Sequence, residues 1–436
     1  MQDGIVAQRA REDFGLDENL NEVSVVDEYL KVRTTVSKNF GQRVWFITDA
    51  CLSVVVTLLL EDITNPTGLN LIDSPSTDKT TILSWFYDIE GITYKTDNFT
   101  PASFVSHSSN VKEKDLPKVD LLPRIRYKCI IIPELAPIFQ KRREDLIVIF
   151  SILTRAFDGH GLETDSGVRG RRGYKGDYLF AWLGASTPLD FRVWNTMGKL
   201  GSRLLFLTVS GDNSNRERVQ TVLSGLRSEK SYKSKVEECR KVIHDFLIFL
   251  WRQTGGVRKV KWDTKGDSEV LVECIVNIAN LVARARSVVS VWREKDSEYN
   301  YNQPTIEHPY RLSRILYNLA RAHAIIQGRN QINEDDLKVI IEVGLSSMPD
   351  DRRQVLNLLL QASPGEDIET GDLTKKLGVS EPTARAIMQT LDVLGIVDLD
   401  KPGMGKSYRI KFKEDFGWFL SDDFRGLRGE DDKIPF

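Results

Sequence analysis

The sequence predicts an α/β protein in which a parallel β-sheet flanked by helices is followed by a helical region and a small C-terminal domain. An apolar strand at residues 69–72 leads through a tight loop to Lys79, which opens a helix. A second apolar run, residues 129–132, has no polar alternation, which is typical of a strand buried on both faces of a parallel sheet. From about residue 214 the apolar residues recur at helical spacing.

The composition is that of an ordinary globular protein. The chain has 436 residues, 41% hydrophobic and 28% charged, and a formal net charge of −2. A chain so close to neutral is not a polyanion binder as a whole, so any contact with nucleic acid must be local. Its four cysteines form no C-x-x-C pair, and its longest apolar run, residues 51–60, is too short to cross a bilayer. We therefore expect a cytoplasmic protein with reduced thiols and no membrane contact.

The loop at residues 73–80, DSPSTDKT, has the layout of a phosphate-binding loop. In the pattern G-x-x-x-x-G-K-[ST], the glycines let backbone N–H groups close around phosphates, the lysine neutralises their charge and the hydroxyl ligates magnesium. Lys79 and Thr80 are present, but Asp73 and Asp78 occupy the two glycine positions. The residues expected to contact nucleotide are Asp73, Ser74, Pro75, Ser76, Thr77, Asp78, Lys79, Thr80 and Thr81.

The two aspartates leave two interpretations of this loop open. A carboxylate beside a triphosphate adds like charge, and a Cβ at a glycine position is strained where the turn needs a positive φ. Asp78 could also pair with Lys79 and withdraw it from phosphate. The loop therefore either binds ATP or is a remnant.

The strand at residues 129–132 ends in Pro133 and Glu134. Such strands usually end in Asp-Glu, where the aspartate holds magnesium and the glutamate polarises the attacking water. Proline replaces the aspartate here, so Glu134 is the predicted catalytic acid and, with Thr80, the predicted metal-facing group. The alternative is that Glu134 is an acid stabilised at a helix N-terminus. One helix is expected over residues 138–157.

Residues 158–178 combine glycines with a basic cluster. Glycine-rich arms with several guanidinium groups suit a hairpin that contacts a nucleic-acid backbone, and Tyr174 could stack on a base. The predicted DNA-binding residues are Arg169, Arg171, Arg172 and Lys175. A solvated loop is the alternative.

Three further residues stand at strand or helix ends. Ser186 and Thr187 follow an apolar strand, where side chains reach the crevice of an open α/β sheet. Arg203 precedes the apolar run 204–207, and Arg311 opens a helix. An amphipathic segment is expected over residues 270–292.

The order and spacing of the predicted C-terminal elements are typical of a helix-turn-helix with a wing. Helices are predicted at 352–362, 370–377 and 380–394, followed by a hairpin around residues 401–406. The segment 400–407, DKPGMGKS, matches the end of a phosphate-loop pattern, but it leads into an alternating strand rather than a helix. Protein contact is as consistent with these helices as DNA contact.

Taken in order, these motifs resemble those of AAA+ ATPases, and more narrowly of the minichromosome maintenance (MCM) branch, over residues 45–415. The resemblance implies an AAA+ P-loop core with a helical lid and a winged helix. It implies sensor 1 at Ser186 or Thr187, an arginine finger at Arg203, a sensor 2 arginine at Arg311, and a DNA-binding hairpin at the basic cluster. The predicted parts are an N-terminal helical segment (1–44), the nucleotide-binding core (45–213), the lid (214–348), the winged helix (349–415) and a tail (416–436).

The first functional hypothesis is a DNA-associated ATP hydrolase, a helicase or translocase. It binds ATP and Mg²⁺ between subunits of a ring such as a hexamer, with Glu134, Arg203, Arg311 and Thr187 as catalytic residues. Its partners are DNA and further copies of the chain, or another ATPase chain that supplies a competent loop. The alternative is a pseudo-ATPase of the same fold that acts as a DNA-binding or assembly module. A regulator that works mainly through the winged helix is a third hypothesis.

Overall fold

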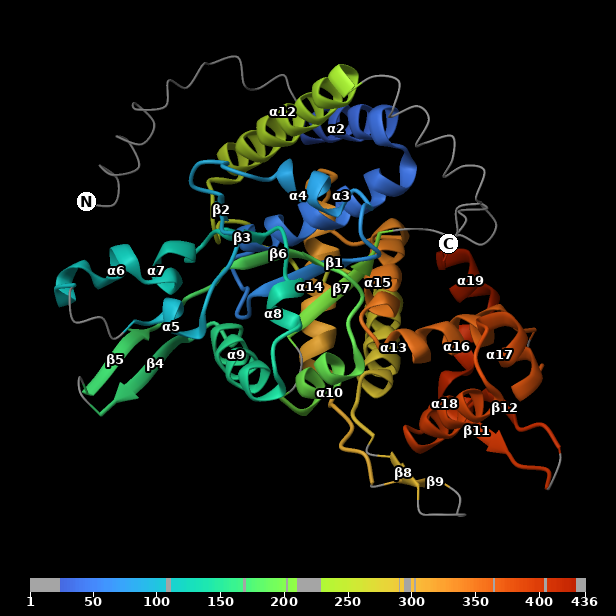
Figure 1. The fold of residues 1–436 in the computed structure, drawn as a ribbon. Helices are drawn as coiled ribbons and strands as arrows, with labels where there is room; N and C mark the ends of the chain where they lie inside the picture. Colours follow the sequence, from blue (N-terminus) through green and yellow to red (C-terminus); the bar gives the residue numbers. More distant parts are fainter. Residues whose placement is uncertain are drawn as a thin grey trace.

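The computed structural model describes residues 24–106, 111–167, 170–200, 203–209, 229–289, 291–293, 299–301, 303–363, 365–403 and 406–428. Its centre is a five-stranded parallel sheet (Figure 1). In sheet order the strands are β2 (Thr93–Lys95), β3 (Cys129–Ile132), β6 (Ala181–Ser186), β1 (Thr67–Ile72) and β7 (Leu204–Thr208). The prediction of an α/β fold with a parallel sheet flanked by helices is confirmed.

Both faces of this sheet are buried. Along β3, Cys129 and Ile131 join one hydrophobic cluster, whereas Ile130 and Ile132 join the other. Successive side chains of a strand point to opposite faces, so a strand covered on both sides needs an uninterrupted apolar sequence. This explains the run from which the strand was predicted.

Two sets of helices cover the two faces. One cluster includes side chains of α2 (Val25–Phe40), α3 (Gln42–Val56), α12 (Glu229–Thr254), α13 (Glu269–Ala285), α14 (Tyr310–Ile326) and α15 (Glu334–Ser346). The other includes side chains of α7 (Leu121–Ile125), α8 (Ala136–Phe139), α9 (Arg143–Ala156) and α10 (Phe191–Leu200). The N-terminal helix α2 packs against α3 and α12, so it forms the outer layer of the first set (Figure 1).

One helical stretch of the described chain, residues 42–59, is long and apolar enough to cross a membrane. It consists of α3 and the short helix η2 (Thr57–Leu59). Within the fold 83% of this stretch is buried, as in the core helix of a globular protein.

Two helix predictions were wrong in their boundaries. The helix expected over 138–157 is two helices, α8 and α9, separated by the extended residue Arg142. The acids Glu144 and Asp145 lie in the first turn of α9, where negative charge is favourable to the helix dipole. The segment expected over 270–292 leaves the helix after Ala285, and β8 (Val291–Arg293) pairs with β9 (Tyr299–Tyr301).

The C-terminal part has three helices and a three-stranded antiparallel sheet. The helices are α16 (Asp350–Gln361), α17 (Thr370–Leu377) and α18 (Glu381–Val393), close to the predicted ranges. The strands are β10 (Ile368–Glu369), β12 (Arg409–Phe412) and β11 (Val397–Asp400), in that sheet order. The DKPGMGKS segment connects β11 to β12, which agrees with its interpretation as a hairpin. Its residues 404–405 lie outside the described part.

The segment from residue 416, predicted as a C-terminal tail, is folded over its described part. Residues up to 428 form η4 (Glu414–Leu420) and α19 (Asp422–Arg428). Phe416, Phe419 and Phe424 are buried, each at 1% exposure; Phe419 stacks on Phe412 and Phe416 and meets the Phe424 ring edge-on. Aromatic burial on this scale holds the segment in the core. Residues 429–436 lie outside the described part.

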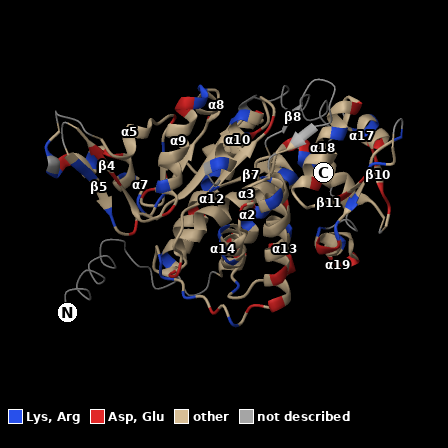
Figure 2. Ribbon diagram, turned by 90° about the horizontal axis from the view of Figure 1, so that it is seen from below, with Lys and Arg blue, Asp and Glu red and all other residues tan. Residues whose placement is uncertain are grey.

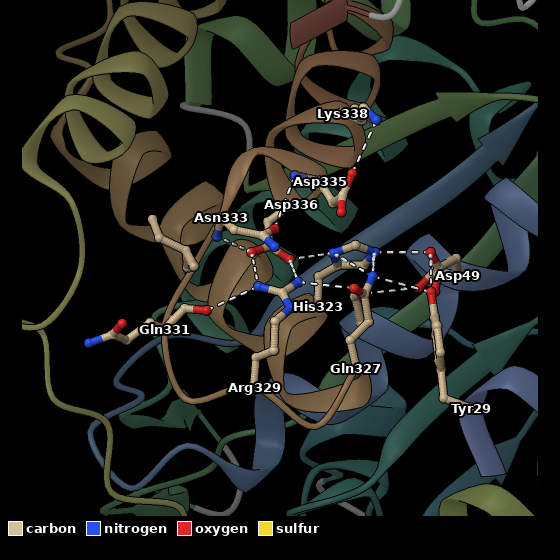
Figure 3. A network of polar contacts seen from close by, with 12 residues as sticks. Tyr29, Asp49, His323, Gln327, Arg329, Gln331, Asn333, Asp335, Asp336 and Lys338 are labelled. Carbon is tan, nitrogen blue, oxygen red and sulfur yellow. Dashed lines mark hydrogen bonds and ion pairs between the residues drawn. The ribbon is translucent and has the colours of Figure 1, made fainter. Parts of the chain in front are cut away.

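A buried polar network joins α2 and α3 to α14 and α15 (Figure 3). His323 on α14 lies between two carboxylates, with its Nε2 2.9 Å from Asp49 Oδ2 on α3 and its Nδ1 2.5 Å from Asp336 Oδ1 on α15. Arg329 donates to both oxygens of Asp336, at 2.8 and 2.6 Å, and the Tyr29 hydroxyl donates to Asp49 at 3.1 Å. Two cations thus balance two anions in a place closed to water.

Burial alone would lower the pKa of His323, but the charges of Asp49 and Asp336 and their hydrogen bonds raise it to about 9. Because the pKa of the unfolded side chain is 6.5, the stabilisation by this proton is fully present below pH 6.5 and is lost as the pH rises through about 9. The shift corresponds to a free energy on the order of 3 kcal/mol.

We predict that His323→Gln lowers the midpoint of thermal unfolding at pH 6, because it removes the cation that Asp49 and Asp336 share and leaves Asp336 with Arg329 alone. The gap to the wild type should narrow between pH 7 and pH 10. Scanning calorimetry across this range measures it, with His160→Gln at an exposed histidine as the control. A gap that stays constant with pH would contradict the assignment of the proton to His323.

Candidate functional site

The predicted phosphate loop begins where the connections from two neighbouring strands run in opposite directions across the sheet. From β1 the chain runs to β2 at one edge, whereas from β6, the neighbour of β1, it crosses β1 to reach β7. Ligands of open α/β sheets bind outside the carboxyl ends of strands at such a switch point. The loop begins there, and the Asp73 N–H donates to the Ser186 carbonyl of β6 at 3.2 Å.

Lys79 lies inside the loop. It is the first residue of α4 (Lys79–Ser84) and is only 6% exposed. Its Nζ donates to the carbonyls of Asp73 (2.9 Å) and Ser74 (2.6 Å) and to Thr77 Oγ1 (2.9 Å). Burial lowers its pKa, partly offset by the charges of Asp73 and Glu134. The loop is thus wrapped around a cation, which is the charge a phosphate would meet.

Each of the two aspartates accepts a hydrogen bond from a group other than the Lys79 ammonium. Asp73 Oδ1 accepts from the Ser74 N–H at 2.6 Å. Asp78 accepts a hydrogen bond from Tyr232 on α12, whose hydroxyl also lies 2.9 Å from Thr81 Oγ1, and burial raises the pKa of Asp78. The ion pairs found in the described part of the chain do not include one between Asp78 and Lys79. The pairing considered from the sequence is therefore not the arrangement seen.

Neither of the two positions that are glycine in the phosphate-loop pattern, Asp73 and Asp78, has a positive φ. Ser76 adopts it, with φ of 65°. This region is unfavourable for a residue with a Cβ, so the loop stores some backbone strain at Ser76. Asp73 and Asp78 do not have a positive φ, so neither adopts the conformation for which the pattern uses glycine.

The acidic and hydroxyl side chains predicted near the loop differ in their exposure and in their hydrogen-bond partners. Glu134 is exposed, and its Oε1 accepts from the N–H of Ala136, the first residue of α8, at 2.9 Å. Thr187 is half-buried just after β6. The Ser186 hydroxyl is buried and without a hydrogen-bond partner among the described residues, so it is the stronger polar candidate of the two.

A magnesium ion would find few protein ligands here. The described residues contain no group of three or more histidine, cysteine or acidic side chains that could hold a metal. The Thr80 hydroxyl is exposed at the first turn of α4. Mg²⁺ typically keeps several waters and binds one or two protein groups with substrate phosphates, so Thr80 and Glu134 fit a nucleotide-borne ion.

The two predicted catalytic arginines lie at the opposite end of the sheet. Arg203 Nη2 is 3.2 Å and Arg311 Nη2 is 3.8 Å from Asp158 Oδ1. Arg203 directly precedes β7, whose first residue pairs with Gly68 at the start of β1. Five residues of strand separate that point from the loop, about 16 Å. Within one chain, the arginines and the loop therefore do not form one site.

The basic segment is a β-hairpin, as predicted. β4 (Gly161–Ser166) and β5 (Gly170–Lys175) pair antiparallel and project from the body of the molecule (Figure 1). Its charges are mixed (Figure 2): Arg171 and Lys175 both pair with Glu163, at 2.5 and 3.6 Å. The Tyr174 hydroxyl donates to Asp120 at 2.7 Å, which anchors the hairpin. Arg172 faces Thr164 across the ladder, and Arg169 lies outside the described residues.

Comparison with known proteins gives little at the level of sequence. No family model and no curated protein sequence matches the chain. Among solved structures it is similar to a full-length MCM homolog from Methanopyrus kandleri, at 10% identity and a TM-score of 0.39. The alignment covers 76% of this chain and 60% of that one, so the chain spans less than two thirds of that structure's length.

We predict that Gly173→Ala disrupts the hairpin. Gly173 has φ of 140°, and a Cβ there would clash with the Leu162 carbonyl and approach Glu163 Cα to 2.6 Å. Hydrogen exchange of residues 161–175 should rise several-fold. Gly167→Ala, where a Cβ meets nothing within 4 Å and φ is not positive, is the control. Equal protection in both variants would show that the ladder is not as described.

Proposed function

We propose that this chain is a DNA-associated, oligomeric AAA+ ATPase of the MCM type, which binds ATP at residues 73–81. The observation that carries the proposal is the buried ammonium of Lys79, wrapped by the loop at the switch point of the sheet. The three oxygens accept from all three N–H donors of the ammonium, but they are neutral and do not offset its charge. A phosphate oxygen that replaced one of them would supply the missing negative charge.

The separation of the charged groups supports action between subunits. Arg203 and Arg311 lie at the amino ends of the strands and the loop lies at their carboxyl ends, about 16 Å apart. A head-to-tail neighbour brings one end against the other, and such heterologous contacts close into rings. The proposed assembly is therefore a ring of identical chains, or one that alternates with a second ATPase chain.

In this assignment Glu134 has two roles. Lys79 would bind the phosphates, and Thr80 and Glu134 would hold an ion that neutralises developing phosphate charge. Glu134 also exchanges its contact with Ala136 for the attacking water, which the hydroxyl of Ser186 or Thr187 helps to orient. Arg203 and Arg311 stabilise the transferred phosphoryl group from the neighbour.

DNA contact is assigned to two parts of the chain. The hairpin β4/β5 presents Arg171, Arg172 and Lys175 on a projecting arm. Residues 349–415 have the element order of a winged helix, with α17 and α18 as the helix-turn-helix pair. The division into core (45–213), lid (214–348) and winged helix is part of this proposal.

A pseudo-ATPase of the same fold is the second candidate. The observation that favours it is the position of Glu134, whose carboxylate accepts from the N–H of Ala136, the first residue of α8. An acid held in this way serves the local fold. In that case the chain would act as an assembly or DNA-binding module.

We predict that a labelled ATP analogue with magnesium binds the wild type and binds Lys79→Ala at least ~10-fold more weakly, because a charge-assisted contact is lost. Equilibrium anisotropy titrations measure this, with Lys141→Ala at an exposed lysine as the control. Absence of binding to all three, alone or with DNA, would favour the pseudo-ATPase.

We predict that Arg172→Ala/Lys175→Ala weakens DNA binding to a similar extent for every sequence tested, since backbone contacts carry no sequence information. The slope of log affinity against log salt should fall by about one unit for each phosphate contact removed. Arg192→Ala, at an exposed arginine paired with Asp190, is the control. An unchanged slope would remove the hairpin from the DNA interface.

A further inference from the structure

Three guanidinium groups share one carboxylate at the amino end of the sheet. Asp158 Oδ2 lies 3.1 Å from Arg155 Nη1, and Oδ1 contacts Arg203 and Arg311. The three arginines come from different elements: the last turn of α9, the residue before β7 and the first turn of α14. One side chain thus fixes the relative positions of a core strand and a lid helix.

The two arginines would repel each other without this carboxylate. The Arg203 side chain is 11% exposed and that of Asp158 is 20% exposed, so solvent screens the cluster only weakly. Burial lowers the pKa of Arg203, and the charge of Arg311 lowers it further. Asp158, which contacts both guanidinium groups, and the nearby charge of Glu307 offset this repulsion.

The same aspartate stands at the root of the hairpin. Only Gly159 and His160 separate it from β4, and the backbone there is tightly held. Gly159 has φ of 79°, and a Cβ on it would come within 2.8 Å of the Thr64 carbonyl. Its own carbonyl accepts from the Tyr178 N–H at 2.8 Å, just past β5. A displacement of the hairpin root would therefore move the carboxylate with it.

We propose that Asp158 is a positioning residue that holds Arg203 and Arg311 ready for the nucleotide of a neighbouring copy and links them mechanically to the β4/β5 hairpin. The inference rests on the proposed function insofar as it assigns those arginines to a neighbour's nucleotide. The link runs through Gly159 and the hairpin root. Binding of DNA to the hairpin changes the positions of Arg203 and Arg311 through this link.

The first test needs no ATP. Arginine modification by phenylglyoxal, followed by mass spectrometry, is compared in the wild type and Asp158→Asn. Arg203 and Arg311 should be labelled several-fold faster in the variant, while Arg353, paired with Asp350, should not change. Asp350→Asn is the matched control and should accelerate labelling of Arg353 alone. Unchanged labelling of both Arg203 and Arg311 would overturn the positioning role.

The second test separates binding from turnover. Asp158→Asn should lower DNA-stimulated kcat by about tenfold, which corresponds to about 1.4 kcal/mol in the barrier. KM should stay within twofold, because the phosphate loop lies at the other end of the sheet. Asp158→Glu retains the charge and should restore part of the rate. A wild-type kcat in Asp158→Asn would overturn the link to turnover. A wild type that binds no nucleotide would overturn the proposed function, and the labelling result would still decide the positioning role.

Discussion

The burial of the parallel sheet on both faces is the constraint on which the rest of the structure depends. Every side chain in the middle of β3 is apolar because each points into one of two hydrophobic clusters. The charged side chains of the candidate site lie instead at the two ends of the strands. Lys79 and Ser186 lie at the carboxyl ends, whereas Arg203 and Asp158 lie at the amino ends. The proposed sharing of a site between subunits follows from this separation.

Buried charge in this chain is compensated locally. Lys79 is compensated by three oxygens of its own loop, Arg203 by Asp158, and His323 by Asp49 and Asp336. The His323 network differs from the other two because both of its carboxylates are nearly inaccessible, so no external anion can enter it. Lys79 and Arg203 are closer to the ends of strands, where a ligand or a neighbouring chain can approach. The proposal assigns binding roles to Lys79 and Arg203 and a structural role to His323.

The fold was predictable where one local signal was enough. The strand at 129–132 followed from its unbroken apolar run, and the hairpin at 161–175 from its glycines. The break between α8 and α9 was missed because the apolar spacing continues through it, and only the charges of Glu144 and Asp145 mark the new start. The packing of Phe416, Phe419 and Phe424 was missed because their partner Phe412 lies in a different element.

The sequence was enough to predict the individual residues of the candidate site, but not which residues contact one another. Lys79, Arg203 and Arg311 stand at recognisable element ends, so the sequence could mark them. That Asp78 bonds to Tyr232, about 150 residues away, and that Asp158 binds both arginines, depends on tertiary packing that no local pattern encodes. The same limit applies to Glu134, whose contact with Ala136 is visible only once α8 is formed.

The central claim is that a loop with aspartate at both glycine positions still encloses phosphate around Lys79. The measurement that tests it most directly is a crystal structure of the chain grown with a non-hydrolysable ATP analogue and magnesium. The account predicts that the β- and γ-phosphates lie within hydrogen-bond distance of Lys79 Nζ, with Asp78 still bonded to Tyr232. An empty loop, or a nucleotide held elsewhere in the chain, would contradict it.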